Sequence, residues 1–210
     1  SEIPGVIVGI MAPDLPVVLW GRNAEWLEDE GFQRVFPLVH KMIVDSRQIG
    51  DNGLHYVRAL RSQGKLVGDL AWTRLTSTRQ TISNVFADAG VTSRFKDVAS
   101  IAIDHTGDMI SAAYLAGWLA SGAPSANVTL ARAPKTAIVP TIRIAGPGLA
   151  IEIGLAAMLT VRVNQDEHRA MVPPVDDGEA MREELSVLCP DAQFNRSITI
   201  AGKLLEAAGK

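Results

Sequence analysis

The sequence has few of the features that mark several common protein classes. It contains a single cysteine, Cys189, so the chain cannot form an internal disulfide. Its longest apolar stretches, among them Ile110–Ala120 and Leu149–Leu159, fall short of the roughly 18 apolar residues that indicate a transmembrane helix, and we expect no membrane span. The first residues, Ser1–Gly5, lack the positively charged segment that opens a secretion signal. We therefore expect a cytoplasmic location.

Clustered positive charge and metal-ligand spacing are also missing. The 20 Lys and Arg residues stand against 23 Asp and Glu residues, and the basic residues are dispersed without runs. A nucleic-acid groove needs clustered cations, so we expect no nucleic-acid partner. The four histidines are far apart in the sequence, at His40, His55, His105 and His168. Without paired cysteines or a His-Glu-x-x-His motif, this spacing predicts no metal site.

Neither of the common nucleotide-binding loops is present. The sequence contains no Gly-x4-Gly-Lys-Ser/Thr loop. Gly146-Pro147-Gly148 looks like half of a dinucleotide fingerprint, but the third glycine is missing and the residues that follow have the pattern of a strand. This segment predicts a hairpin turn instead, and we expect no cofactor.

Hydrophobic patterns in the first half of the chain predict strands separated by helices. Strands are expected at Val6–Met11, Val17–Trp20, Met42–Val44 and Val98–Asp104. Helices are expected between Asn23 and His40 with interruptions near Gly31 and Pro37, over Leu54–Leu60, from Leu75 through Phe86 to a stop at Gly90, and over Met109–Ser121.

After Asn127 the pattern changes to strands with little helical period. Extended segments are expected at Val128–Arg132, Thr136–Ala145 and Leu149–Val163, with a bend or bulge within Ala156–Thr160, before one helix through Met181–Leu188 and another from about Phe194 to Ala208. The fold class predicted is α/β, with a mixed sheet and flanking helices: parallel-type units first, then antiparallel strands and two terminal helices. We expect residues 1–210 to form a single unit, with any subdivision near residues 123–127 and a second hinge at 172–178.

The pair Asp104-His105, at the end of a predicted strand, is the most enzyme-like feature. An acid beside a histidine can serve as orienter and base in a hydrolase. Adjacent residues of a strand point to opposite faces, however, and no nucleophile motif such as Gly-x-Ser-x-Gly accompanies them. A loop histidine with no catalytic role is therefore the favoured interpretation.

The segment Gly68–Arg79 concentrates side chains that recognise partners. It contains the carboxylate of Asp69, the indole of Trp72, the guanidinium groups of Arg74 and Arg79, and several hydroxyls. Trp and Arg often anchor interfaces, and Arg also binds carboxylates and phosphates in pairs of hydrogen bonds. Two interpretations stay open from composition alone: a recognition surface, or an internal cluster in which Asp69 is a cap and Trp72 fills the core.

The same segment carries a family resemblance. Asp69-Leu-Ala-Trp72-Thr-Arg74-Leu-Thr76 resembles the Asp-Leu-x-Trp-x-Arg-x-Thr signature of the OpcA family, the glucose-6-phosphate dehydrogenase assembly proteins. Other blocks that resemble the family follow its order along the chain: Pro13–Trp20, Ile43–Ser46, Leu115–Ser121 and Glu183–Leu185 with Asp191. The chain departs from the family pattern at Gly21 and Thr78, where the family has Trp, and it resembles the carboxyl-terminal part of the family or a short member.

The resemblance implies a protein that binds glucose-6-phosphate dehydrogenase and promotes its assembly or activity without catalysing a reaction itself. It implies that seven residues form the contact surface or hold it in shape: Trp20, Asp69, Trp72, Arg74, Thr76, Arg79 and Trp118. A sugar-phosphate or nucleotide-binding regulatory domain, in which Arg74 and Arg79 hold a phosphate near a helix start, is the alternative hypothesis. Self-association is left open.

Overall fold

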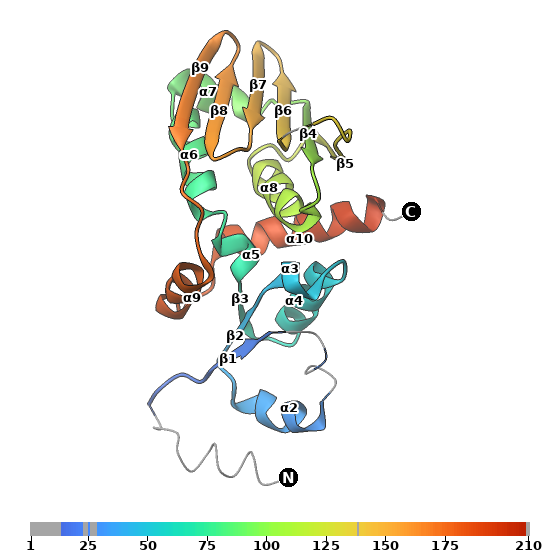
Figure 1. Cartoon of the computed structure of the whole chain (residues 1–210), viewed down its shortest axis with the longest axis vertical. Helices are drawn as coiled ribbons and strands as arrows, with labels where there is room; N and C mark the ends of the chain where they lie inside the picture. The colour runs from blue at the N-terminus through green and yellow to red at the C-terminus, as the bar shows by residue number, and fades with distance from the viewer. Residues whose placement is uncertain (1–13, 23–24, 26–28, 138, 209–210) are drawn as a thin grey trace. The chain divides into compact units, whose positions relative to one another are not determined.

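The computed structural model describes residues 14–22, 25, 29–137 and 139–208, which form two compact units (Figure 1). The first unit comprises residues up to Thr73 together with Asp177–Pro190, and the second comprises Arg74–Asp176 with Asp191–Lys210. The chain thus crosses between the units after Thr73, Asp176 and Pro190. The second crossing lies in the predicted hinge 172–178, whereas residues 123–127 lie inside the second unit. That the chain is a single folding unit stays a prediction.

The first unit is built on a three-stranded parallel sheet in the order β1-β2-β3. All four residues of the central strand are buried, as expected for a parallel strand with neighbours on both sides. The elements of this unit are β1 (Val18–Gly21), α2 (Glu30–Val35), the 3-10 helix η2 (Phe36–Leu38), β2 (Lys41–Val44), α3 (Ser46–Ile49), α4 (Gly53–Ser62), β3 (Leu66–Asp69), α5 (Leu70–Thr73) and α9 (Asp177–Ser186).

The second unit contains a six-stranded mixed sheet in the order β5-β4-β6-β7-β8-β9. Its elements are α6 (Thr76–Phe86), α7 (Ala89–Phe95), β4 (Ser100–His105), α8 (Met109–Gly122), β5 (Asn127–Arg132), β6 (Thr141–Gly146), β7 (Leu149–Gly154), β8 (Met158–Val163), β9 (Asp166–Met171) and α10 (Ala192–Ala208). Every second residue of β4, β7 and β8 is buried, as are Ile142 and Ile144 of β6, and the other residues of these strands are partly or fully exposed. One face of the sheet is therefore packed and the other is open.

Helices α8 and α10 pack closely against each other within the core of the second unit. Ten of the fourteen residues of α8 are buried, from Ile110 to Ala120 apart from Ser111. A Cβ at Gly117 would overlap the backbone oxygen of Ser197 in α10, so only glycine allows the two helices to approach this closely. The rings of Tyr114 and Phe194, with centroids 6.0 Å apart, continue the contact.

The mixed α/β fold class predicted from the sequence is confirmed. The predicted hairpin turn is present between β6 and β7, where Gly148 has a φ of +66° that suits glycine. Two predicted features, the strand Val6–Met11 and the part of a helix that contains Trp26, lie outside the described residues.

Other sequence-based expectations need correction. Gly90 does not end a helix, because it lies in the first turn of α7. Asp88 caps α7 by accepting a hydrogen bond from the backbone N–H of Gly90 at 2.7 Å. Strand β5 pairs parallel to β4 and so departs from the predicted antiparallel half. Strands β3 and β9 were not predicted: β3 runs directly into α5, and β9 is an exposed edge strand with four polar or charged residues in succession.

Candidate functional site

The motif Gly68–Arg79 begins at the carboxyl end of β3, forms α5 and continues into α6. The boundary between the two compact units falls within it, between Thr73 and Arg74. Residues 68–73 of the motif therefore belong to the first unit, and residues 74–79 belong to the second.

Asp69, the last residue of β3, is buried and ties two turns together. Its Oδ1 accepts hydrogen bonds from the backbone N–H of Ser46 and of Ala71, each at 3.0 Å. These amides open α3 and α5, two helix starts that need acceptors for their free N–H groups. The carboxylate thus fixes the ends of two neighbouring parallel strands, β2 and β3, relative to the helices that follow them.

A buried ion pair lies beside this junction. Lys41 in β2 is 2% exposed, and its Nζ donates hydrogen bonds to Glu184 Oε2 at 2.7 Å and to the carbonyl oxygen of Val187 at 2.8 Å. It also donates to the carbonyl oxygen of Glu184. A buried ammonium group costs free energy unless its protons are satisfied, and these three acceptors satisfy them. The pair therefore holds α9 and the residues after it in the first unit.

Thr73 and Gly68 also contact the Glu184 carboxylate. The hydroxyl of Thr73 donates to Glu184 Oε1 at 2.5 Å, and the carbonyl oxygen of Asp69 lies 3.1 Å away from the same hydroxyl. A Cβ on Gly68 would overlap Glu184 Oε2. The small residue that opens the motif thus makes room for a carboxylate far along the chain.

Sequence reasoning did not identify Lys41 as part of this site, and it noted Glu184 only as part of a resembling block. A lysine in a strand whose four residues are all buried was the available signal, because a buried Lys needs a partner. Nothing in the sequence identified the partner, which is 143 positions away.

The three described tryptophans differ in exposure. Trp72 in α5 and Trp118 in α8 are 3% and 8% exposed, so neither presents its indole to a partner in this conformation. Trp20 in β1 is 47% exposed, and the guanidinium carbon of Arg22 lies 5.3 Å from the centre of its ring. Of these three, only Trp20 has the exposure that suits an interface anchor, and Arg22 gives it a cation–π neighbour.

The second half of the motif lies in α6 and the residue pair before it. Arg79 is 9% exposed, and its Nη2 donates a hydrogen bond to Thr76 Oγ1 at 3.1 Å. Arg74 is partly exposed and lines a pocket of about 320 Å³ together with Thr78 and apolar residues such as Leu155, Leu159 and Pro173. Arg79 is not among the residues that line this pocket, so the structure does not bring both arginines to it.

Asp104 and His105 do not form a catalytic pair. Asp104 accepts a hydrogen bond from Arg143 Nη2 at 2.5 Å on the open face of the sheet, whereas His105 is buried on the packed face. The Nδ1 atom of His105 has no hydrogen-bond partner among the described residues. The alternation of the strand thus separates the two side chains, as expected from the sequence.

The described residues hold no metal-binding cluster and no membrane-spanning helix. In that part of the chain, no three His, Cys, Asp or Glu residues come together in a way that could hold a metal ion. Its helices are all too short or too polar to cross a bilayer.

Comparison with known proteins adds a family and a fold. Residues 65–198 match the family model described as the C-terminal domain of the glucose-6-phosphate dehydrogenase subunit. Over 124 residues the chain is 28% identical to OpcA of Synechocystis sp., a protein named for the OxPP cycle. That match covers 58% of this chain and 26% of the relative, so the chain spans about a quarter of the relative's length.

The fold is shared with solved dehydrogenases. A dehydrogenase from Chromobacterium violaceum matches with a TM-score of 0.55 at 10% identity, over 97% of this chain and 77% of that one. The dehydrogenase MviM from Clostridium difficile matches with a TM-score of 0.51 at 10% identity, over 91% of this chain and 78% of that one. At such low identity the similarity concerns the fold alone.

Proposed function

Because the chain belongs to the OpcA family, as its match to the family's C-terminal domain shows, we propose that it is a non-catalytic assembly factor or allosteric effector that binds and activates glucose-6-phosphate dehydrogenase. The single observation that carries this proposal is the family match over residues 65–198, which includes the whole motif from Gly68 to Arg79. The name of the relative, which refers to the OxPP cycle, supports the same pathway. We further propose that the chain acts in the cytoplasm beside this enzyme.

The burial of the motif supports a structural role for its residues and a contact role for exposed residues elsewhere. Asp69 and Trp72 are almost fully buried, and Arg79 is nearly so, which suits residues that hold a surface in shape. We assign direct contact with the enzyme to exposed side chains, first of all Trp20 with its neighbour Arg22. A half-exposed indole can bury a large apolar area on binding at little cost in side-chain entropy.

The proposal is tested by mixing the purified chain with the glucose-6-phosphate dehydrogenase of the same organism. We expect the two proteins to elute together from a size-exclusion column, and the activation constants of the enzyme to change. An enzyme that neither co-elutes with the chain nor changes its kinetics would contradict the proposal. Self-association of the chain alone is measured in the same column run.

The alternative, a sugar-phosphate or nucleotide-binding domain, draws on the pocket beside Arg74. A guanidinium at the wall of a pocket of about 320 Å³ suits a small phosphate ester, because Arg binds phosphate oxygens through paired hydrogen bonds. A thermal-shift screen against pentose-pathway phosphates and NADP tests it. A rise in the unfolding temperature that Arg74→Gln removes would favour this alternative over a purely protein-binding role.

A further inference from the structure

Strand β5 is an open edge of the six-stranded sheet (Figure 1). Asn127 N–H donates to the carbonyl oxygen of Ala99 at 2.8 Å, and Ala133 N–H donates to that of His105 at 2.9 Å, so the odd-numbered residues bond toward β4. Successive peptide groups of a strand point to opposite sides, which directs the N–H and C=O groups of Val128 and Leu130 away from β4. No strand of the described chain pairs with that side.

This edge lacks the protective features common on edge strands. β5 contains no proline, pairs in unbroken register with β4 and carries one charge, on Arg132 at its end. The opposite edge, β9, has charged side chains at Asp166, Glu167 and Arg169. Charges, prolines and bulges are the usual means of keeping other strands away. The two edges of one sheet therefore differ, and β5 is the one left able to accept a strand.

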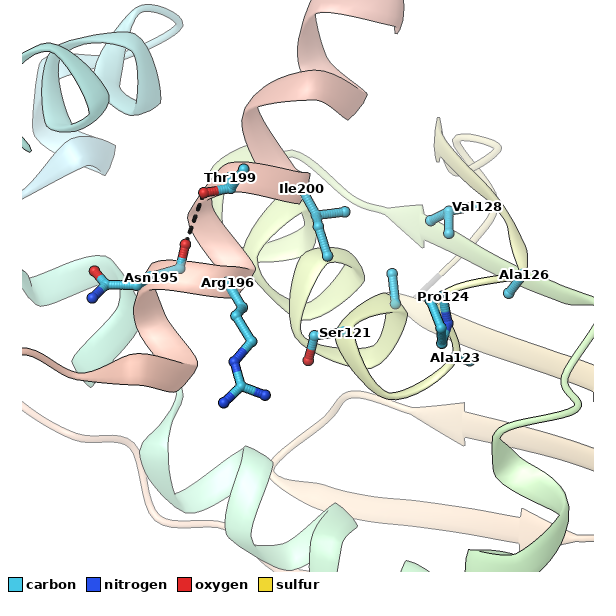
Figure 2. A pocket seen from close by; sticks show the side chains of 10 residues that line it. Ser121, Ala123, Pro124, Ala126, Val128, Asn195, Arg196, Thr199 and Ile200 are labelled. Carbon is cyan, nitrogen blue, oxygen red and sulfur yellow. Dashed lines mark hydrogen bonds between the residues drawn. The ribbon is translucent and has the colours of Figure 1, made fainter. Parts of the chain in front are cut away.

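An apolar groove adjoins this edge. It has a volume of about 540 Å³ and is bounded by Val128 of β5, by Ala123 and Pro124 after α8, and by Ile200 and Arg196 of α10 (Figure 2). Val128 pairs in register with the buried residue Ile101, which places its side chain on the packed side of the sheet, where the groove lies. A side chain from an added strand that pointed to this side would enter the groove.

Arg196 is the one charged residue in the described lining of the groove. Its side chain extends away from α10, and Ser121 of α8 lies beside it in this view (Figure 2). Arg196 is exposed, and among the described residues it forms no ion pair with a carboxylate. Neither β5 nor the lining of the groove contains an acidic residue. The site therefore combines backbone donors and acceptors, an apolar floor and unopposed positive charge.

We propose that β5 and this groove form a docking site for an extended acidic segment of another protein. The segment adds to the sheet as a strand beside β5, places an apolar side chain in the groove and brings a carboxylate to Arg196. Charge favours this occupant over a second copy of the chain, because a second copy would bring its own Arg132 and Arg196 to the same site. The inference concerns other residues than the motif and goes beyond the proposed function.

The test selects binders from a library of short random peptides displayed on phage, with the full chain immobilised. We expect the selected peptides to alternate apolar and polar residues and to contain Asp or Glu. Leu130→Pro removes one outward N–H group without removing a bond to β4, and we expect it to weaken the binding of a synthetic selected peptide by about tenfold. Leu130→Val, which keeps the N–H group, is the matched control and should bind as the unchanged chain does.

A second variant keeps the test independent of how well Leu130→Pro folds. Arg196→Gln alters only an exposed side chain, and we expect it to weaken acidic peptides by roughly three- to tenfold, whereas Lys203→Gln on the same helix has no effect. Absence of selected peptides, or peptides that bind all four variants equally, would overturn the proposal. So would a dimer of the chain in sedimentation experiments that Leu130→Pro abolishes, because a second copy would then be the occupant.

Discussion

The Oε2 atom of Glu184 lies where a side chain at residue 68 would begin, so close that a Cβ on Gly68 would overlap it. The carboxylate cannot move away freely, because Lys41 and Thr73 both donate hydrogen bonds to it. The position of this acidic residue of α9 therefore depends on the glycine that opens the family-like motif.

Gly68→Ala should destabilise the fold. The added methyl group forces the Glu184 carboxylate out of its place beside Lys41, and overpacking of this kind costs about 1–3 kcal/mol. The free energy of unfolding in urea measures the effect. Gly154→Ala is the matched control, because a Cβ there meets nothing within 4 Å, and its free energy of unfolding should change by less than about 1 kcal/mol. Equal stability of the two variants would show that Glu184 does not occupy this position.

Removing one partner of the buried ion pair should be more costly. Lys41→Met leaves the Glu184 carboxylate without its cation, and Glu184→Met leaves the ammonium unpaired, which typically costs about 3–5 kcal/mol in each case. The double variant should be more stable than the sum of the two losses predicts. Arg143→Met, which breaks the more exposed pair with Asp104, is the control and should cost less than about 1 kcal/mol. Additive effects of the two buried substitutions would contradict a direct pair.

Gly117→Ala tests whether the two compact units unfold together. The methyl group would meet the backbone of Ser197, which cannot rotate away as a side chain can, so this variant should lose at least as much stability as Gly68→Ala. We expect both variants to shift one shared unfolding transition. The reason is that the Asp177–Pro190 segment of the first unit lies in the sequence between two segments of the second. Two transitions, each moved by only one of the variants, would show independent domains.

The carboxyl group of Glu167 should titrate below its usual range. A hydrogen bond from Arg162 Nε at 2.7 Å lowers its pKa most, and a second from Arg169 Nε at 2.6 Å adds to the effect. Because the folded-state pKa is below the unfolded value, the stabilisation is present above the unfolded pKa and is lost as the pH falls through the folded pKa. Carboxyl NMR titration measures this, and Arg162→Gln should move the midpoint upward. An unchanged midpoint in Arg162→Gln would rule out this cause.

Trp20→Ala should weaken binding to glucose-6-phosphate dehydrogenase without unfolding the chain. Loss of an aromatic anchor at an interface commonly costs about 2 kcal/mol or more, a change of roughly thirtyfold in the dissociation constant. Met171→Ala, which removes another exposed apolar side chain, is the control and should leave binding unchanged. Equal affinities of the two variants, measured by titration calorimetry, would remove Trp20 from the contact surface.

The local sequence determined the elements whose signals lie within a few residues. The start of α8 follows from Asp108, whose side chain accepts from Ser111 N–H, and its end follows from the glycine and proline near residue 122. The turn at Gly148 and the termination of α4 before Gly64 depend on φ angles that glycine adopts readily. β9 escaped prediction because an exposed edge strand needs no apolar alternation, and its polar residues therefore carry no period.

The tertiary structure alone decided what the motif residues do. From the sequence, Asp69 and Trp72 suited a surface and an internal cluster equally well; the fold buries both, and it gives Asp69 the amide of Ser46, 23 residues away. It also joins Lys41 to Glu184 across 143 positions and sets β5 parallel to β4 at an open edge. These outcomes depend on contacts between distant segments, whose free energy is gained only after the chain has closed the loops between them. Local propensity therefore specifies elements, and long-range packing specifies which side chains remain available to a partner.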